Sequence, residues 1–276
     1  MTLPPGAELL ARVGGGDINE AFRVVLADGR EAFVKSRSDA APGEYAAEAA
    51  GLAWLAEPGA LRTPAVLDVG EDYLALEWVE PGGLDRAGIE VLGSGLAATH
   101  LAGAESFGAS GAGASAGFGS LRLPNDPAED WPTFYAERRL RPLARIASDR
   151  GALSRAGIEA VERVCERMPG LAGPAEPPAR VHGDLWSGNV MGGADGRPWL
   201  IDPSAYGGHR EVDLAMLRLF GAPSERVFTA YEEAAPLAPG WEERVELYQL
   251  LPLLVHALLF GGSYRAAAER VALRYA

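Results

Sequence analysis

The sequence predicts an α+β protein of two lobes: a small N-terminal lobe with an antiparallel sheet and one main helix, and a larger, mainly helical C-terminal lobe. The first observation is a hairpin signal, because two β-rich runs flank Asp28-Gly29. The second is the Pro-Gly-Gly segment at residues 81–83, a composition typical of a hinge. The third is the change to helical apolar spacing from residue 84. We therefore expect lobes over residues 1–80 and 81–276.

Four strands and one helix are expected in the N-terminal lobe. The strands cover residues 21–27, 30–35, 63–70 and 73–79, and the helix covers residues 43–55. In the helix, Tyr45, Leu52 and Leu55 recur at helical spacing with alanines between them, which is typical of a helix packed on a sheet. The pattern predicts a sheet with this helix on one face.

The C-terminal lobe is expected to consist of helices and one long irregular segment. Apolar spacing predicts helices at about 89–101, a pair over 131–168, and two more at 224–233 and 240–260. The last is interrupted by Pro252 and is too short to span a membrane. Residues 103–120 are mostly Gly, Ala and Ser, so they are predicted to form a mobile loop, either a substrate lid or a plain linker.

The composition narrows the class of protein. A formal charge of −13 and a pI near 4.8 argue against a nucleic-acid surface, which needs clustered Lys and Arg. A chain of 276 residues can fold without a partner, so a monomer suffices and the oligomeric state stays open.

Cys165, the single cysteine, cannot form an internal disulfide and is expected in the core. Without an apolar leader or spanning segment, a cytoplasmic location without membrane contact is expected.

The most informative stretch is His182-Gly-Asp184, which is followed by Asn189 and, after a short apolar strand, by Asp202. Kinases place an Asn five residues after the Asp of their catalytic loop, and a metal-binding Asp follows on the next strand. One carboxylate, Asp184, would orient a substrate hydroxyl and accept its proton. The amide oxygen of Asn189 and the carboxylate of Asp202 would hold Mg²⁺ on the triphosphate of ATP.

A lone lysine points to the same chemistry. Of 25 basic residues, 24 are arginine and one, Lys35, is lysine, so a compact ammonium is indicated at that place. Lys35 ends the second predicted strand, where its ammonium could reach the α- and β-phosphates. Glu48 in the predicted helix is the expected partner of Lys35, and Glu44, one turn earlier, is the second candidate.

Backbone contacts to the nucleotide are expected at two further places. Gly14, Gly15 and Gly16 precede the first predicted strand, where bare N–H groups can approach phosphate oxygens. The third glycine of a G-x-G-x-x-G motif is missing, so a simple turn is the alternative. The backbone at Glu77 and Val79, next to the predicted hinge, is expected to recognise the edge of the adenine base of ATP.

Two polar residues are expected to have structural roles. Asp213 lies where a helix begins and is expected to cap that helix or to accept hydrogen bonds from catalytic-loop amides. His100 lies at the end of the 89–101 helix and is expected to pack there rather than to act as a catalyst.

With these residues in place, the chain resembles the fructosamine kinase (ketosamine 3-kinase) family, within the aminoglycoside phosphotransferase-like and protein-kinase-like fold. The similar stretches are Gly-Gly-Asp-Ile-Asn at 15–19 and residues 131–142, 182–189, 202–216 and 247–264. The segments Leu-Trp-Ser-Gly at 185–188 and Gly-His-Arg-Glu at 208–211 are its narrowest signals. One departure is Asp17, where some relatives have a redox-sensitive cysteine, so disulfide-linked dimer control is not expected.

The resemblance implies ATP-dependent phosphorylation of the sugar 3-hydroxyl of ketoamines, carried by a small molecule or by a glycated protein side chain. It implies that Lys35 and Glu48 form the ion pair that holds the phosphates, and that Mg²⁺ is required. It also implies candidates for shaping the sugar pocket, which are Trp186, Tyr206, His209 and Arg210. A kinase for another hydroxyl substrate, such as an aminoglycoside, choline or another sugar, is the alternative enzyme, and a nucleotide-binding pseudokinase is the alternative without activity.

Overall fold

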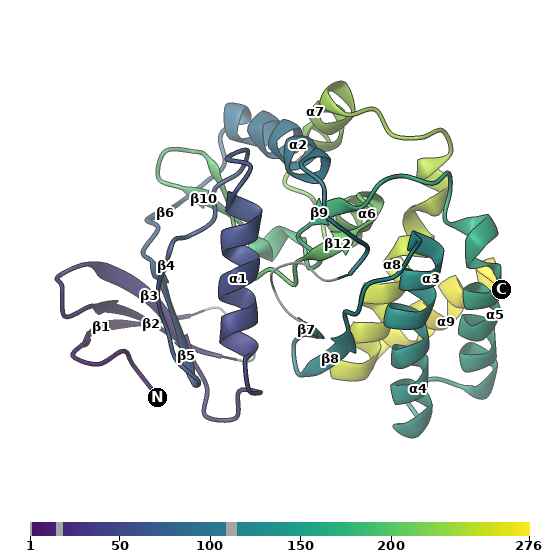
Figure 1. Cartoon of the computed structure of the whole chain (residues 1–276), viewed down its shortest axis with the longest axis horizontal. Coiled ribbons are helices and arrows are strands. Elements are labelled where there is room, and N and C mark those ends of the chain that lie inside the picture. The colour runs from purple at the N-terminus through teal and green to yellow at the C-terminus, as the bar shows by residue number, and fades with distance from the viewer. Residues whose placement is uncertain (1, 15–18, 109–114) are drawn as a thin grey trace.

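Two lobes lie side by side in the computed structural model, which describes residues 2–14, 19–108 and 115–276. Figure 1 shows the N-terminal sheet and one long helix, α1, on the left, and most other helices on the right. The short strands β9 and β12 lie between these two parts. Their position brings the predicted catalytic loop to the junction of the lobes.

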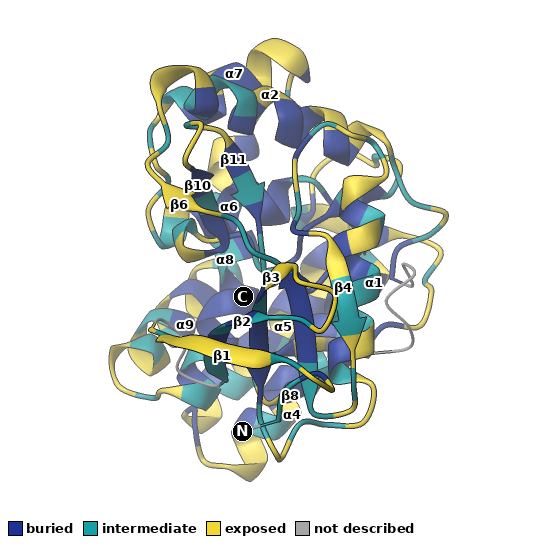
Figure 2. Cartoon of the chain, turned by 90° about the vertical axis from the view of Figure 1, so that its left-hand side faces the viewer, coloured by how far each residue is buried: buried dark blue, intermediate teal, exposed yellow. Residues whose placement is uncertain are grey.

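The N-terminal lobe is one antiparallel sheet in the order β1-β2-β3-β5-β4. Its strands are β1 (Glu8–Val13), β2 (Glu20–Val25), β3 (Glu31–Ser36), β4 (Val66–Val69) and β5 (Tyr73–Glu77). The hairpin predicted around Asp28-Gly29 joins β2 to β3. Strand β1 was not predicted from the sequence. It is an edge strand whose residues are mostly exposed, so it lacks the buried alternation that reveals β2 and β3 (Figure 2).

Alternation along β3 separates two apolar clusters. Ala32 and Val34 point to one face of the sheet, where they pack with residues of β2. Helix α1 (Glu44–Ala56) covers the other face, and its Tyr45 and Leu52 belong to a cluster with residues of β5. Lys35 follows Val34 and therefore points to the face that α1 covers. The strand pattern thus carries the lysine under the helix that bears Glu48.

The chain leaves the first lobe after β5. Four residues later, β6 (Pro81–Gly82) pairs with β10 (Val190–Gly193), a strand near the predicted catalytic loop. This change of sheet supports a lobe boundary near residue 80, which we keep as a proposal.

The C-terminal lobe is built from helices packed around one large core and one smaller apolar cluster. They are α2 (Arg86–Leu101), α3 (Trp131–Tyr135), α4 (Arg141–Asp149), α5 (Arg155–Leu171), α6 (Glu211–Leu219), α7 (Arg226–Ala234), α8 (Trp241–Leu259) and α9 (Ser263–Tyr275), with a π-helical turn at Ala136–Leu140. Helix α9 was not predicted; it packs on α8 and α5 through small residues, a weak apolar signal. Cys165 is buried in this core, as expected. No helix in the described part of the chain is long and apolar enough to cross a membrane.

Short strands hold the loops between these helices. Strand β9 (Ala179–Val181) pairs with β12 (Tyr206–Gly208), and β10 pairs with β11 (Pro198–Leu200). The predicted catalytic loop lies between β9 and β10, and Asp202 follows β11. Two small sheets therefore fix both ends of the segment that carries the proposed chemistry.

The loop predicted over residues 103–120 is partly wrong. It ends in strand β7 (Ser115–Phe118), which pairs with β8 (Leu121–Pro124), while residues 109–114 lie outside the described part of the chain. Phe118, Leu121 and Leu123 are buried in the C-terminal core and anchor this hairpin. Burial of a few apolar side chains is thus enough to order this end of a segment that is otherwise low in complexity.

An aromatic cluster in the same core includes two residues that were predicted to shape the sugar pocket. His209 was a candidate for the sugar pocket, but its ring is 2% exposed and stacks on Tyr248, with ring centres 5.5 Å apart. Its other neighbour is Trp131, 5.9 Å away, which begins α3. Tyr206, another candidate, is fully buried beneath the guanidinium of Arg139. Both side chains pack in the core, and neither is exposed to solvent.

Burial of His209 predicts a pH dependence of stability. Burial lowers the pKa of His209 to about 4 from the ordinary 6.5, despite the opposing charge of Glu176. The neutral ring is therefore favoured in the folded state, so its contribution is complete above pH 6.5 and is lost as the pH falls toward 4. We expect this loss to reach roughly 3 kcal/mol.

The measurement is urea unfolding of the wild type and of His209→Phe, which keeps an aromatic ring and cannot titrate, between pH 7 and pH 4. The difference between their free energies of unfolding isolates His209 from the other groups that titrate in this range. Parallel pH profiles for the two proteins would contradict the assignment.

Candidate active site

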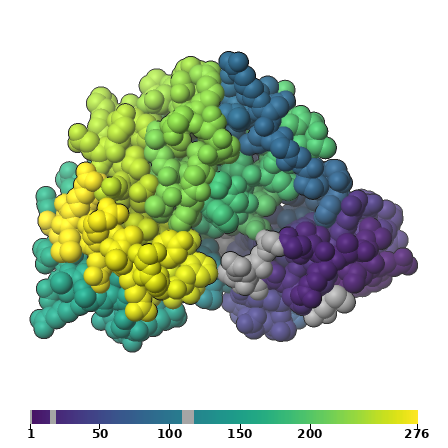
Figure 3. Space-filling model, turned by 180° about the vertical axis from the view of Figure 1, so that it is seen from behind, coloured from purple at the N-terminus to yellow at the C-terminus, as the bar shows by residue number. Residues whose placement is uncertain are grey.

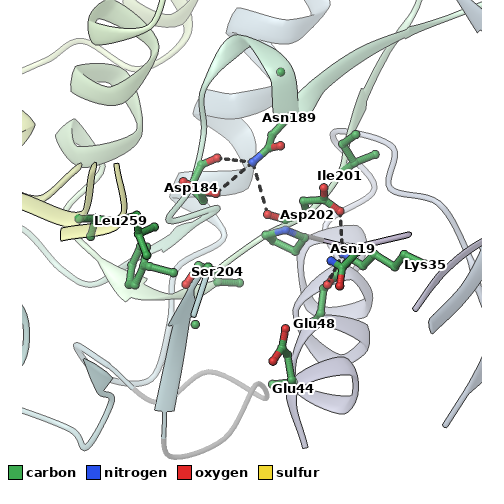
Figure 4. A pocket seen from close by; sticks show the side chains of 18 of the residues that line it. Asn19, Lys35, Glu44, Glu48, Asp184, Asn189, Ile201, Asp202, Ser204 and Leu259 are labelled. Atoms are coloured by element: carbon green, nitrogen blue, oxygen red, sulfur yellow. Dashed lines mark hydrogen bonds and ion pairs between the residues drawn. The ribbon is translucent and has the colours of Figure 1, made fainter. Parts of the chain in front are cut away.

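A cavity of about 500 Å³ opens between the two lobes. Figure 3 shows the surface hollowed between the N-terminal part, in purple, and the C-terminal part, in yellow. Residues from both lobes line the cavity, among them Asn19, Lys35, Glu44, Glu48, Arg122, Asp184, Trp186, Asn189, Asp202 and His256. Figure 4 shows several of these side chains pointing toward one another. All five residues predicted to carry the chemistry are among them.

Lys35 is the centre of the charge arrangement. Its Nζ atom lies 2.5 Å from Oε2 of Glu48 and 2.9 Å from Oδ1 of Asp202. Burial alone would lower the pKa of Lys35, but the charges of Asp202 and Glu48 outweigh burial and raise it above its ordinary value. The ammonium is therefore charged and joins β3 to α1 and to the segment after β11. The choice of Glu48 over Glu44 as the partner of Lys35 agrees with these distances.

The backbone of the catalytic loop requires glycine at position 183. Gly183 has a φ of 81°, in the left-handed region, and a Cβ atom there would lie 2.2 Å from the carbonyl oxygen of Ser204. Asp213 accepts hydrogen bonds from the backbone N–H groups of His182, at 2.7 Å, and Gly183, at 2.9 Å. The expectation that Asp213 bonds to catalytic-loop amides is thus confirmed.

His182 ties the catalytic loop to the strand before Asp202. Its Nε2 donates to the carbonyl oxygen of Ile201 at 2.9 Å, while its Nδ1 accepts from the backbone N–H of Asp184 at 3.3 Å. Because the ring is buried, the pKa of His182 is lowered, which favours the neutral form that can both donate and accept. His182 therefore sets the spacing between the backbones that carry Asp184 and Asp202.

Asp184 and Asn189 are held together. Nδ2 of Asn189 donates to the backbone oxygen of Asp184 at 2.8 Å and to its carboxylate Oδ2 at 3.2 Å. Burial raises the pKa of Asp184 to about 7, and the negative charge of Asp202 adds to this rise. A carboxylate with a raised pKa is a stronger base than an ordinary Asp, as a general base requires.

Asp202 has the properties of a metal ligand. Its φ of 53° is rare for a residue other than glycine, although Asp tolerates this region better than most. The charge of Lys35 lowers the pKa of Asp202 and outweighs its burial, so the carboxylate is ionised. Because Nδ2 of Asn189 is bonded to Asp184, the amide oxygen of Asn189 stays available to a metal beside the carboxylate of Asp202.

These two oxygen donors fit Mg²⁺ bound together with a nucleotide. Within residues 2–14, 19–108 and 115–276, no three or more His, Cys, Asp or Glu side chains are grouped to hold a metal ion. Mg²⁺ is commonly held by one or two protein carboxyl or amide oxygens, with water and phosphate oxygens completing its shell. Asp202 and Asn189 are therefore suited to a metal that arrives with ATP.

An aromatic wall forms the opposite side of the cavity. Trp186, which was predicted to contact the substrate, is 41% exposed, lines the cavity and lies against the backbone at Gly188. His256 and Phe260, which also line the cavity, stand at the C-terminal end of α8 with ring centres 5.3 Å apart. Sequence reasoning gave neither a role, although both lie in the family-like stretch 247–264.

A charged rim was also missed. Glu44 accepts hydrogen bonds from Arg37 of the segment after β3, at 2.6 Å, and from Arg122 of β8. These residues line the cavity next to Phe118. The contact joins α1 to a hairpin that the sequence did not reveal, because its partners lie 78 residues apart.

Several predicted site residues lie away from the cavity. Arg210 pairs with Glu176, at 2.7 and 2.8 Å. Arg210, Tyr206 and His209 do not line the cavity, so this lining does not support their predicted contact with the sugar. Glu77 and Val79 are not part of the lining either. Gly14 is exposed, and Gly15 and Gly16 lie outside the described residues.

Comparisons with known proteins agree on the kind of protein. A probable ketoamine kinase of Thermus thermophilus is 41% identical over 257 residues, which cover 93% of this chain and 90% of the relative. A crystal structure of a candidate fructosamine-3-kinase from Thermobifida fusca has a TM-score of 0.88 at 47% identity, over 97% of this chain and 94% of the other. A choline kinase from Streptococcus pneumoniae, with a TM-score of 0.61 at 16% identity over 97% and 93%, shares the fold alone.

The predicted fold class is therefore confirmed as α+β, bilobal and protein-kinase-like. The family model described as fructosamine kinase matches residues 6–275, nearly the whole chain. This match, with the relative from Thermus thermophilus, shows that the chain belongs to the fructosamine kinase family.

Proposed function

We propose that this enzyme transfers the γ-phosphoryl group of ATP to the 3-hydroxyl of a ketoamine, the rearranged adduct of a sugar and an amine. The observation that carries the proposal is the meeting of Lys35, Glu48, Asp184, Asn189 and Asp202 around one cavity. Membership of the fructosamine kinase family supports the choice of substrate. Because the reaction consumes ATP, we place the enzyme in the cytoplasm.

The nucleotide would lie on the N-terminal side of the cavity. Lys35, held by Glu48, would contact the α- and β-phosphates. Asn189 and Asp202 would hold Mg²⁺, which when bound neutralises charge on the phosphates. We keep the backbone at Gly14, Gly15 and Gly16 for phosphate contacts, and that at Glu77 and Val79 for adenine, as parts of this proposal.

Asp184 would orient the substrate hydroxyl and accept its proton. Its carboxylate lines the cavity and is held by Asn189 from the side. The raised pKa suits an Asp that exchanges a proton near neutral pH. The oxygen left by the proton is the nucleophile that attacks the γ-phosphorus, and the bond to the β,γ-bridging oxygen breaks.

The ketoamine would lie between Asp184 and the aromatic wall. Trp186, His256 and Phe260 offer flat apolar faces against which a sugar or an alkyl amine can pack. The amine of a ketoamine is cationic at neutral pH, and aromatic faces attract cations. The carboxylate of Asp184 adds negative charge to this side of the cavity. A free ketoamine or a glycated protein side chain provides the same group.

A substrate panel tests the proposed reaction. We expect ADP release, followed with a coupled assay, with ribulosamines or fructosamines, and little release with an aminoglycoside, with choline or with free sugars. Turnover of an aminoglycoside or choline alone would favour the alternative kinase. Tight ATP binding without ADP release from any of these compounds would favour a pseudokinase, although all five chemical positions are intact.

Removing the carboxylate of Asp184 should abolish most turnover. We expect Asp184→Asn to lower kcat by about 10² to 10⁴, because the substrate hydroxyl loses its proton acceptor. Asp195→Asn is the matched control, since Asp195 is an exposed carboxylate of the same lobe that pairs with Arg62. Steady-state kinetics with a ketoamine make the measurement. A kcat of Asp184→Asn close to that of the control would remove Asp184 from this role.

Replacing Lys35 should damage the handling of ATP. Lys35→Met leaves Glu48 and Asp202 without their cation, so we expect kcat/KM for ATP to fall by about 10² or more. ATP binding by calorimetry should weaken in parallel. Arg30→Met, which removes an exposed cation from the same hairpin, should leave both quantities unchanged. Normal ATP kinetics in Lys35→Met would mean that another cation does this work.

A further inference from the structure

A continuous chain of buried polar groups lies beneath the catalytic loop, away from the cavity. His100, at the end of α2, is 2% exposed, and Tyr231 of α7 and Asp213 of α6 are buried completely or almost completely. None of the three lines the cavity. Since buried polar groups are costly unless paired, their mutual contacts need an explanation.

A donor and an acceptor can be assigned to each hydrogen bond between these three side chains. The carboxylate of Asp213 can only accept hydrogen bonds when ionised, so Nε2 of His100, 3.1 Å away, is the donor. In the neutral ring Nδ1 is then an acceptor, and the hydroxyl of Tyr231 donates to it at 2.8 Å. Burial raises the pKa of Tyr231 and the charge of Arg210 opposes this rise, so the guanidinium lies near the same hydroxyl. The hydrogen bond at each side chain therefore determines which atom of the next side chain donates and which accepts.

The outer end of the chain is also fixed. Arg210 makes two hydrogen bonds to the carboxylate of Glu176, in the segment that leads into β9. It also donates to the carbonyl oxygens of Ala235 and Pro236, just after α7. The guanidinium thus cannot turn away from Tyr231 without breaking several charge-assisted bonds.

The inner end of the chain is the backbone next to Asp184. The two oxygens of Asp213 hold the N–H groups of His182 and Gly183. Burial favours protonation of Asp213, yet the hydrogen bonds from His100 and from the backbone of Gly183 help to keep its pKa below the ordinary value, so the acceptor stays ionised. A rotation of this carboxylate would release the peptide between His182 and Gly183, one residue before Asp184.

We propose that His100, Tyr231 and Arg210 are positioning residues, which lock the Asp213 carboxylate and through it hold the catalytic loop in the geometry that Asp184 needs. The proposal rests on the proposed kinase reaction for its effect on turnover. It replaces the expectation that His100 only packs a helix end, and it gives Arg210 a role remote from the sugar.

Tyr231→Phe is the decisive variant, because it removes one hydroxyl and keeps the ring. Tyr248→Phe is the matched control: Tyr248 is 1% exposed, and its hydroxyl also bonds two partners, Nε1 of Trp131 and the carbonyl oxygen of Ala172, but neither leads to the catalytic loop. Both variants should lower the melting temperature. Only Tyr231→Phe should lower kcat, by about tenfold, with KM for ATP unchanged.

Hydrogen–deuterium exchange gives a second readout that does not require turnover. The amides of His182 and Gly183 should exchange about tenfold faster in Tyr231→Phe than in the wild type, and at the wild-type rate in Tyr248→Phe. If no ketoamine is turned over by the wild type, the proposed reaction fails while exchange still decides the positioning role.

His100 provides a rescue test. Gln can place an N–H group near the position of Nε2, so His100→Gln should keep more of the kcat and of the amide protection than His100→Ala. The proposal is overturned if Tyr248→Phe loses as much kcat and protection as Tyr231→Phe. It is also overturned if Tyr231→Phe retains wild-type values of both.

Discussion

The structure depends on one buried cation. Lys35 lies between Glu48 and Asp202, and the last of these is 167 residues further along the chain. Without the ammonium, two carboxylates from different lobes would face each other in a site of low polarity, where like charges repel strongly. The ammonium therefore links the sheet of the first lobe, helix α1 and the segment after β11. That placement also leaves the ammonium directed at the cavity in which a triphosphate would bind.

Hydrogen bonds to the backbone hold the catalytic loop in place, as Lys35 links the two lobes. Gly183, His182 and Asp213 hold the peptides around Asp184 through hydrogen bonds that are buried and short. Because main-chain groups have less freedom than long side chains, the spacing between Asp184, Asn189 and Asp202 is fixed before any ligand arrives. Preorganisation of this kind removes a reorganisation cost from phosphoryl transfer, which depends on positioning and electrostatics more than on covalent chemistry.

The sequence predicted most of the fold and the chemical centre, because these depend on local patterns and on rare residue types. The spacing from Asp184 to Asn189 and the single lysine are such signals. Edge strand β1, helix α9 and hairpin β7–β8 were missed or misjudged, because their residues are exposed, small or of low complexity. Within Gly-His-Arg-Glu at 208–211, His209 and Arg210 were candidates for shaping the sugar pocket. In the fold it is an aromatic stack and two ion pairs, with Glu176 and Arg244, that no linear pattern reveals.

Helix α1 carries two carboxylates with different partners. Glu48 holds Lys35, and Glu44, one turn earlier, contacts Arg122 of the hairpin β7–β8 in the other lobe. A rigid helix cannot shift one of these groups without shifting the other. The nucleotide side of the cavity and its outer rim are therefore mechanically linked, so a ligand that displaces the rim also perturbs the lysine that meets the phosphates.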